Sequence, residues 1–172
     1  MPNSSRSPIF MRVRRRLLAA LSLVATGALT AKAADDKTPK AADDKTLRFP
    51  GDPPDHKVVY QFNQADAEYH EHVIFSVGQM VQKYGDNIRV VVTAIGPGIH
   101  ILLQKPQRPV ARLIREKVAG LSDYGVEFHA CGNTLKALKL GEKDVLPFAK
   151  IVEVGAADLM ELQAQGFAYI SW

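Results

Sequence analysis

The side chain best suited to nucleophilic chemistry in this 172-residue chain is its single cysteine, Cys131. It follows a short apolar run over 126–130 and precedes a polar Gly-Asn-Thr step where a helix is expected to begin. Unpaired backbone N–H groups and the positive end of a helix dipole lower the pKa of a thiol there, and the thiolate is the nucleophilic form. Position alone leaves a second interpretation open, because free cysteines are often buried and inert.

Three loops are expected at the ends of successive strands, and each could contribute to one pocket with Cys131. Glycines let backbone amides approach a ligand closely, and such amides can donate to an anion or to a sulfur. A histidine placed there can donate a proton or carry charge toward a bound sulfur anion. The candidate pocket residues in these loops are Asn63, Gly96, Gly98, His100, Asn133 and Thr134. A tight turn that only ends a strand explains the Gly-Pro-Gly loop equally well.

The histidines do not form a metal-binding pattern. His70 and His72 lie two positions apart on an expected helix and face different sides, and His70 is expected to be solvated. His129 would share a strand face with Cys131, so it is a further candidate pocket residue, an acid or base, or a hydrogen-bonded core residue. Cys-x-x-Cys, His-Glu-x-x-His and complete nucleotide-binding glycine motifs are missing from the sequence, so we expect no metal and no cofactor.

Residues 1–33 have the composition of a secretory signal peptide. They contain basic residues and no acidic one, an apolar run over 17–29, and Ala31-Lys32-Ala33 as a small-x-small cleavage site. The apolar run is shorter than the roughly 20 residues of a membrane span. We therefore expect cleavage after Ala33 and a periplasmic or secreted protein with no membrane attachment after cleavage. An uncleaved N-terminal anchor is the alternative.

The excess of basic residues belongs to the expected signal peptide. The full chain has 22 basic and 18 acidic residues, and six of the basic ones lie within 1–33, which leaves 16 basic against 18 acidic residues. No basic stripe remains, so nucleic-acid binding is not expected. One cysteine cannot form an internal disulfide, so the thiol is buried, pairs with another molecule or is reactive.

The pattern after the signal peptide predicts a linker over 34–55, which includes a polar octad repeat, and one folded domain over 56–172. Strands are expected over 57–62, 88–95, 126–130, 151–154 and 167–170, and helices over 67–84, 109–122, 133–140 and 156–165. This alternation predicts an α/β fold, a three-layer αβα sandwich with a mostly parallel five-stranded sheet. In such sheets ligands bind outside the carboxyl ends of the strands.

Over residues 57–172 the chain resembles the DsrE/DsrF-like sulfur-relay family. The segments that carry the resemblance are Val58-Val59-Tyr60, Gly96-Pro97-Gly98-Ile99, 125–134, Val154-Gly155-Ala156 and 162–170. The resemblance implies an αβα sandwich, homo-oligomers that are commonly trimers or hexamers, and sulfane sulfur carried as a persulfide on a cysteine that corresponds to Cys131. The signal peptide departs from the cytoplasmic members of the family and their relay partners.

Two functions from different classes follow. The first is a periplasmic sulfur-handling protein, a sulfurtransferase or sulfur carrier, that holds sulfane sulfur as a persulfide on Cys131. Since the chain has no second cysteine to resolve the persulfide, the acceptor must be another protein or a small thiol. The alternative is a non-catalytic small-ligand-binding or oligomeric assembly domain of the same fold.

Overall fold

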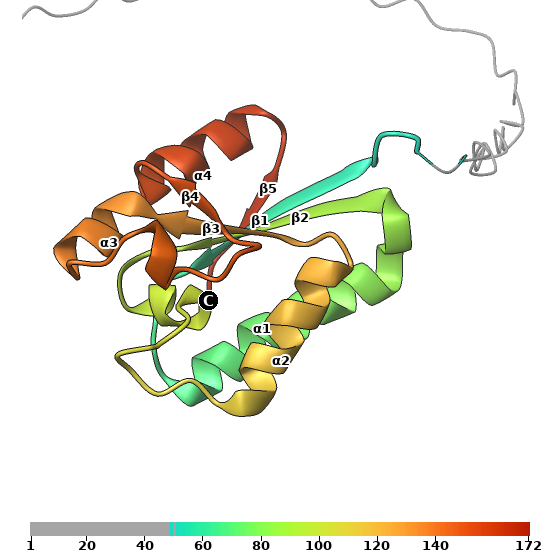
Figure 1. Ribbon diagram of the computed structural model, residues 1–172. Helices are drawn as coiled ribbons and strands as arrows, with labels where there is room; N and C mark the ends of the chain where they lie inside the picture. The colour runs from blue at the N-terminus through green and yellow to red at the C-terminus, as the bar shows by residue number, and fades with distance from the viewer. Residues whose placement is uncertain (1–48, 50) are drawn as a thin grey trace, which may run out of the picture. The chain divides into compact units, whose positions relative to one another are not determined.

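The sheet has five strands, and every neighbouring pair of strands is parallel (Figure 1). The computed structural model describes residue 49 and residues 51–172, so the expected signal peptide and the octad repeat lie outside the described residues. In the order β4-β3-β2-β1-β5, the strands are β4 Lys150–Val152, β3 Glu127–Cys131, β2 Ile88–Ala94, β1 His56–Phe62 and β5 Ala168–Ile170. The predicted α/β fold with a five-stranded sheet is confirmed.

Helices lie on both faces of the sheet, as predicted. α1 and α2 pack together on one face, and α4 lies on the other (Figure 1). The bounds are α1 Ala67–Tyr84, α2 Arg112–Asp123, α3 Gly132–Ala137 and α4 Gly155–Ala164. Among the described residues, no helix combines the length and the apolar character needed to cross a membrane.

Strands β1 and β2 are buried on both faces, which explains their nearly continuous apolar sequences. In β2, Val90 and Val92 belong to the core beneath α1 and α2, whereas Val91 packs with Leu159 and Leu162 of α4. Side chains alternate between the faces of a strand, so one short run of valines serves both layers. The parallel pairing of β2 with β3 places the carboxyl ends of these two strands side by side.

Helix α1 has the predicted bounds because strong signals mark both of its ends. The Asp66 carboxylate accepts a hydrogen bond of 2.8 Å from the Tyr69 N–H, and Gly85 ends the helix with φ of +58°. The expectation that His70 is solvated is wrong, since only 1 % of it is exposed. His70 lies on the inner face of the helix, where its Nε2 contacts the Gln64 carbonyl at 3.2 Å.

Helix α2 begins later than the pattern suggested, at Arg112 instead of residue 109. Its buried stripe consists of Ile114 and Val118, while Leu113 is 58 % exposed. Adjacent positions on a helix point about 100° apart, so only one of two neighbouring apolar residues faces the sheet.

Helix α3 is shorter than expected, ending at Ala137 instead of residue 140. Lys139 takes a φ of +57°, and the Leu140 N–H donates back to the Leu135 carbonyl at 2.9 Å. A 3₁₀ helix follows at Glu142–Asp144. Val145 then forms an isolated antiparallel bridge with Leu103.

The loop after β2 is a 3₁₀ helix, Gly96–Leu102, that crosses directly over the end of β1. A Cβ on Gly98 would lie 2.2 Å from the Phe62 carbonyl oxygen and 2.8 Å from the Asn63 nitrogen. Such an approach of backbone to backbone is available only to glycine. Gly98 therefore serves the packing of the loop on the sheet.

We expect Gly98→Ala to lower the free energy of unfolding by more than about 2 kcal/mol, because backbone atoms cannot yield to a new methyl group as a flexible side chain can. Urea unfolding followed by circular dichroism measures this change.

The matched control is Gly120→Ala within α2, where a Cβ would meet nothing within 4 Å. Alanine is favoured over glycine inside a helix, so this variant should be more stable by about 0.5–1 kcal/mol. Equal stability of the two alanine variants would contradict the packing role of Gly98.

Candidate functional site

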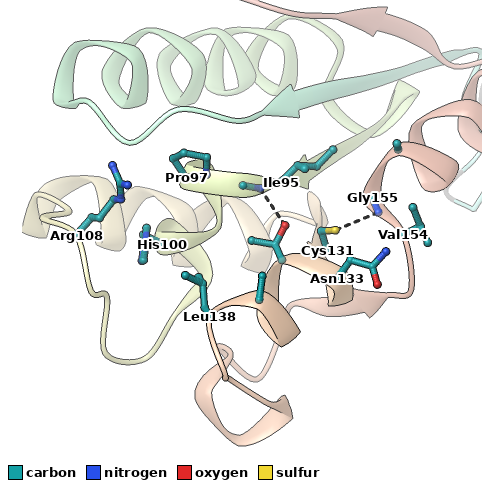
Figure 2. Close-up of a pocket in the computed structure, with 13 residues that line it drawn as sticks. Ile95, Pro97, His100, Arg108, Cys131, Asn133, Leu138, Val154 and Gly155 are labelled. Carbon is teal, nitrogen blue, oxygen red and sulfur yellow. Dashed lines mark hydrogen bonds between the residues drawn. The ribbon is translucent and has the colours of Figure 1, made fainter.

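Cys131 is both the last residue of β3 and the N-cap of α3. It lies in the wall of a cavity of about 500 Å³ at the carboxyl end of the sheet, and the residue is only 4 % exposed (Figure 2). The cavity is lined by Ile95, Gly96, Pro97, His100, Arg108, Cys131, Asn133, Thr134, Ala137, Leu138, Val154, Gly155 and Ala156. Cys131 therefore borders a cavity of a size that accommodates small molecules.

The sulfur of Cys131 accepts hydrogen bonds from two sides. The Gly155 N–H, at the start of α4, donates to Sγ at 3.3 Å (Figure 2). The Thr134 hydroxyl donates from the other side, while its oxygen accepts the Gly96 N–H at 3.0 Å. Thr134 and the start of α4 thus both contact the sulfur, and the loop at Gly96 is joined to them through the Thr134 hydroxyl.

The groups around Cys131 shift the pKa of its thiol. Burial raises the pKa of Cys131, but hydrogen bonds from the Thr134 hydroxyl and from the N–H groups of Gly155, Thr134 and Asn133 outweigh burial and lower it. The Asn133 N–H also donates to the Glu153 carbonyl at 3.1 Å, so we attribute the effect mainly to Thr134 and Gly155. The thiolate is stabilised, as a nucleophilic sulfur requires.

Gly155 is needed for this geometry because there is no room for a side chain. A Cβ at Gly155 would lie 2.7 Å from Cγ1 of Ile95 and 3.0 Å from Cβ of Cys131. The contact joins the start of α4 to β3 across a separation of 24 residues. Sequence reasoning did not assign Gly155 a role, although a glycine directly after a strand and at the start of a helix was a signal available in the sequence.

The structure brings four of the candidate pocket residues together with Cys131, namely Gly96, His100, Asn133 and Thr134. Asn63 lies outside this cavity, in a neighbouring depression. Its Oδ1 accepts a hydrogen bond from the Tyr69 hydroxyl at 3.2 Å. Gly98 is likewise absent from the cavity wall, because it packs beneath the loop against Phe62.

His129 shares a strand face with Cys131 but lies beneath α4, away from the cavity wall. Its Nδ1 lies 2.9 Å from both carboxylate oxygens of Asp158, and the Thr93 hydroxyl donates to Oδ2 of Asp158 at 2.7 Å. An ionised carboxylate only accepts, so Nδ1 carries a proton. The other nitrogen, Nε2, is buried and has no hydrogen-bond partner among the described residues, and it lies 3.8 Å from a carboxylate oxygen of Glu127. Asp158 is therefore the hydrogen-bond partner of the buried His129 ring.

Asp158 anchors the first turn of α4 to the sheet. Its two side-chain partners, Thr93 of β2 and His129 of β3, are directly paired in the sheet register. Asp158 lies one turn after Gly155, and its N–H donates to the Val154 carbonyl at 3.0 Å. The anchor therefore holds the helix end that supplies the Gly155 N–H to the sulfur.

His100 is 2 % exposed and forms part of the cavity wall. Its Nδ1 accepts a hydrogen bond from the Gln107 N–H at 3.3 Å, so the neutral ring carries its proton on Nε2. Burial, followed by the positive charges of Arg108 and His70, lowers the pKa of His100. This direction favours a neutral hydrogen-bond donor at neutral pH over the cationic role considered from the sequence.

In the part of the chain that the structure describes, no group of three or more His, Cys, Asp or Glu side chains is arranged to hold a metal ion.

Comparison with known proteins agrees with this fold. The model of the DsrE/DsrF-like family matches residues 46–172. The chain belongs to the DsrE/DsrF-like family. This family is associated with sulfur relay. No match was found among curated proteins.

Solved structures of similar fold cover almost the whole folded domain. A protein of unknown function from Methanobacterium thermoautotrophicum, MTH1491, has 26% sequence identity and a TM-score of 0.62, over 69% of this chain and 100% of its own. The ychN protein from E. coli has 12% identity and a TM-score of 0.54, over 68% of this chain and 99% of its own, and supports the fold alone.

We expect Thr134→Val to raise the pH midpoint for alkylation of Cys131, because the variant removes the hydroxyl donor and nearly keeps the side-chain volume. A hydrogen bond to a charged group contributes about 1.5 kcal/mol, roughly a tenfold loss of thiolate, and the higher nucleophilicity of a more basic thiolate offsets part of it. The alkylation rate with iodoacetamide at pH 6 should fall about threefold.

Thr134→Ser keeps the hydroxyl and is the control, with a midpoint close to that of the unmodified protein. Identical midpoints for the valine and serine variants would show that the hydroxyl does not stabilise the thiolate.

A second prediction separates the anchoring role of Asp158 from its charge. If Asp158 positions the start of α4, Asp158→Ala raises the alkylation midpoint of Cys131, because the Gly155 N–H moves away from the sulfur. Loss of a nearby negative charge alone would lower this midpoint. Asp158→Asn keeps an oxygen acceptor for Nδ1 of His129 but loses the charge, so its midpoint should equal the original value or lie slightly below it and should not rise.

Glu161→Ala removes an exposed acidic side chain from the same helix and serves as the control. A lower melting temperature of Asp158→Ala with an unchanged or lowered midpoint would exclude the positioning role.

Proposed function

We propose that this protein carries sulfane sulfur as a persulfide on Cys131 and passes it to an external thiol. The observation that carries the proposal is the convergence of the Thr134 hydroxyl and the Gly155 N–H on one sulfur, in the wall of a cavity. Membership of a family associated with sulfur relay supports the same chemistry.

Loading begins with attack of the Cys131 thiolate on the outer sulfur of a donor persulfide. A bond forms between Sγ and that sulfur, the donor's own S–S bond breaks, and the donor leaves as a thiolate with the electron pair. The proton of the donor's terminal sulfur stays with the transferred sulfur. No external oxidant or reductant is needed, since one persulfide and one thiolate are exchanged for another pair.

Unloading is the same exchange in the opposite direction. An acceptor thiolate attacks the outer sulfur of the Cys131 persulfide, and Cys131 leaves as a thiolate. Thiols of low pKa leave faster, so the donors that stabilise the Cys131 thiolate also favour this step. Because the chain contains one cysteine, it cannot release the sulfur by forming an internal disulfide.

Two features outside the described site complete the proposal. Residues 1–33 support export to the periplasm or secretion, as argued from their charge and apolar run. The family resemblance supports a homo-oligomer, a trimer or hexamer, whose size light scattering would measure.

The alternative of a small-ligand-binding domain without chemistry is favoured by one observation, the 4 % exposure of Cys131. In that case Cys131 would resist alkylation in the folded protein, and Cys131→Ala would only destabilise the core by the loss of buried atoms.

The test of persulfide loading is the intact mass of the protein after exposure to an organic persulfide. We expect a gain of one sulfur atom that dithiothreitol reverses and that Cys131→Ser abolishes. Loading that persists in Cys131→Ser, or no gain with either a small organic persulfide or inorganic polysulfide, would refute the proposed function.

A further inference from the structure

The cavity beside Cys131 has an uneven distribution of charge. Of its lining residues none is acidic, and Arg108 is the charged one. Arg108 is exposed and forms no ion pair with any other residue of the described segments 49 and 51–172. Asp66 lies across the neighbouring depression, but its carboxylate caps α1. The guanidinium is therefore available to a ligand.

His100 adds a second hydrogen-bond donor in the same region. Its Nδ1 is occupied by the Gln107 N–H, which leaves the Nε2 proton of the neutral ring as the donor. Arg108 and His100 line the same side of the cavity (Figure 2), and the positive charge of Arg108 contributes to lowering the pKa of His100. Together they offer a cation and a neutral donor to an anionic group.

The groups that could bind an anion and the sulfur of Cys131 lie at different ends of the cavity. Figure 2 shows His100 and Arg108 on one side, and Cys131 with Gly155 on the other. The wall between and around them is largely apolar, formed by residues such as Ile95, Pro97 and Leu138. A volume of about 500 Å³ is in the range that accommodates small molecules.

Building on the proposed function, we propose that the sulfur donor is a low-molecular-weight organic persulfide with an acidic group, bound by Arg108 and His100 while its sulfur reaches Cys131. The apolar wall contacts the carbon chain that joins the two ends. The arrangement selects for a negative charge separated from the sulfur by a short linker, and it disfavours cationic compounds.

A small molecule fits better than the cysteine of a folded donor protein. Only 4 % of Cys131 is exposed, so a partner must place its sulfur inside the cavity to react. A compound of low molecular weight enters such a space without rearrangement of the wall.

Charge selectivity can be measured without any persulfide. Sulfonatoethyl and trimethylammonioethyl methanethiosulfonate carry opposite charges two carbons from the reactive sulfur. A thiolate attacks that sulfur, a mixed disulfide forms, and methanesulfinate leaves with the electron pair. For Cys131, the rate constant with the anionic reagent is divided by that with the cationic reagent. Dividing this value by the same ratio for free 2-mercaptoethanol gives a normalised ratio that reports the electrostatic potential of the cavity.

We expect this normalised ratio to be about tenfold at low ionic strength and to fall with salt, because Arg108 is exposed to solvent. Arg108→Gln should reduce it at least threefold, and Arg108→Lys should keep most of it. Lys105→Gln, an exposed cation of the same loop that is absent from the wall, is the control and should leave the ratio unchanged. A ratio near one, or an Arg108→Gln ratio equal to that of the unmodified protein, would overturn the inference.

A second measurement tests the donor class directly and separates this inference from the proposed function. The persulfide of 3-mercaptopropionate should load Cys131 faster than the neutral persulfide of 2-mercaptoethanol, by a factor that Arg108→Gln removes. Equal loading by both donors keeps the sulfur-carrier function and overturns the donor class. Charge selectivity toward the methanethiosulfonates without loading by either persulfide refutes the carrier function, and the anion preference of the cavity stands.

Discussion

The close approach of the α4 N-terminus to the sulfur of Cys131 is the contact on which the site depends. It requires a parallel sheet, because only then do the ends of β3 and β4 and the start of α4 meet at one edge. It also requires a residue without a side chain at Gly155. The carboxylate of Asp158 then fixes the helix to two strands at once.

Local sequence patterns predicted the parts of this arrangement that local forces determine. The bounds of α1, the two central strands and the junction at Cys131 follow from capping residues, β-branched runs and a Gly-Asn-Thr step. The contacts of Asp158 and Gly155 with β3 join positions 29 and 24 residues apart, and no periodic pattern encodes them. Arg108 lies in an irregular loop, where the sequence gives no rule for the direction of a side chain.

Three buried histidines show the same division between local and long-range information. The strand period predicts that His129 shares a face with Cys131, but it does not indicate that its partner is Asp158 of α4. The spacing of His70 and His72 predicted that they face different sides of the helix. It did not indicate that His70 is the one that faces the core. For His100, the hydrogen bond from Gln107 decides which nitrogen carries the proton, and that contact belongs to the folded loop.

The nearly complete burial of Cys131 bears on which reactions the protein avoids. A thiolate of low pKa in an oxidising environment is ordinarily prone to dead-end mixed disulfides with whatever protein thiols or disulfides it meets. A sulfur that is 4 % exposed in the wall of a cavity is harder for a folded protein to reach than for a small molecule. For the proposed sulfur carrier, this burial would select reaction partners by molecular size, which would protect a reactive sulfur that has no second cysteine beside it.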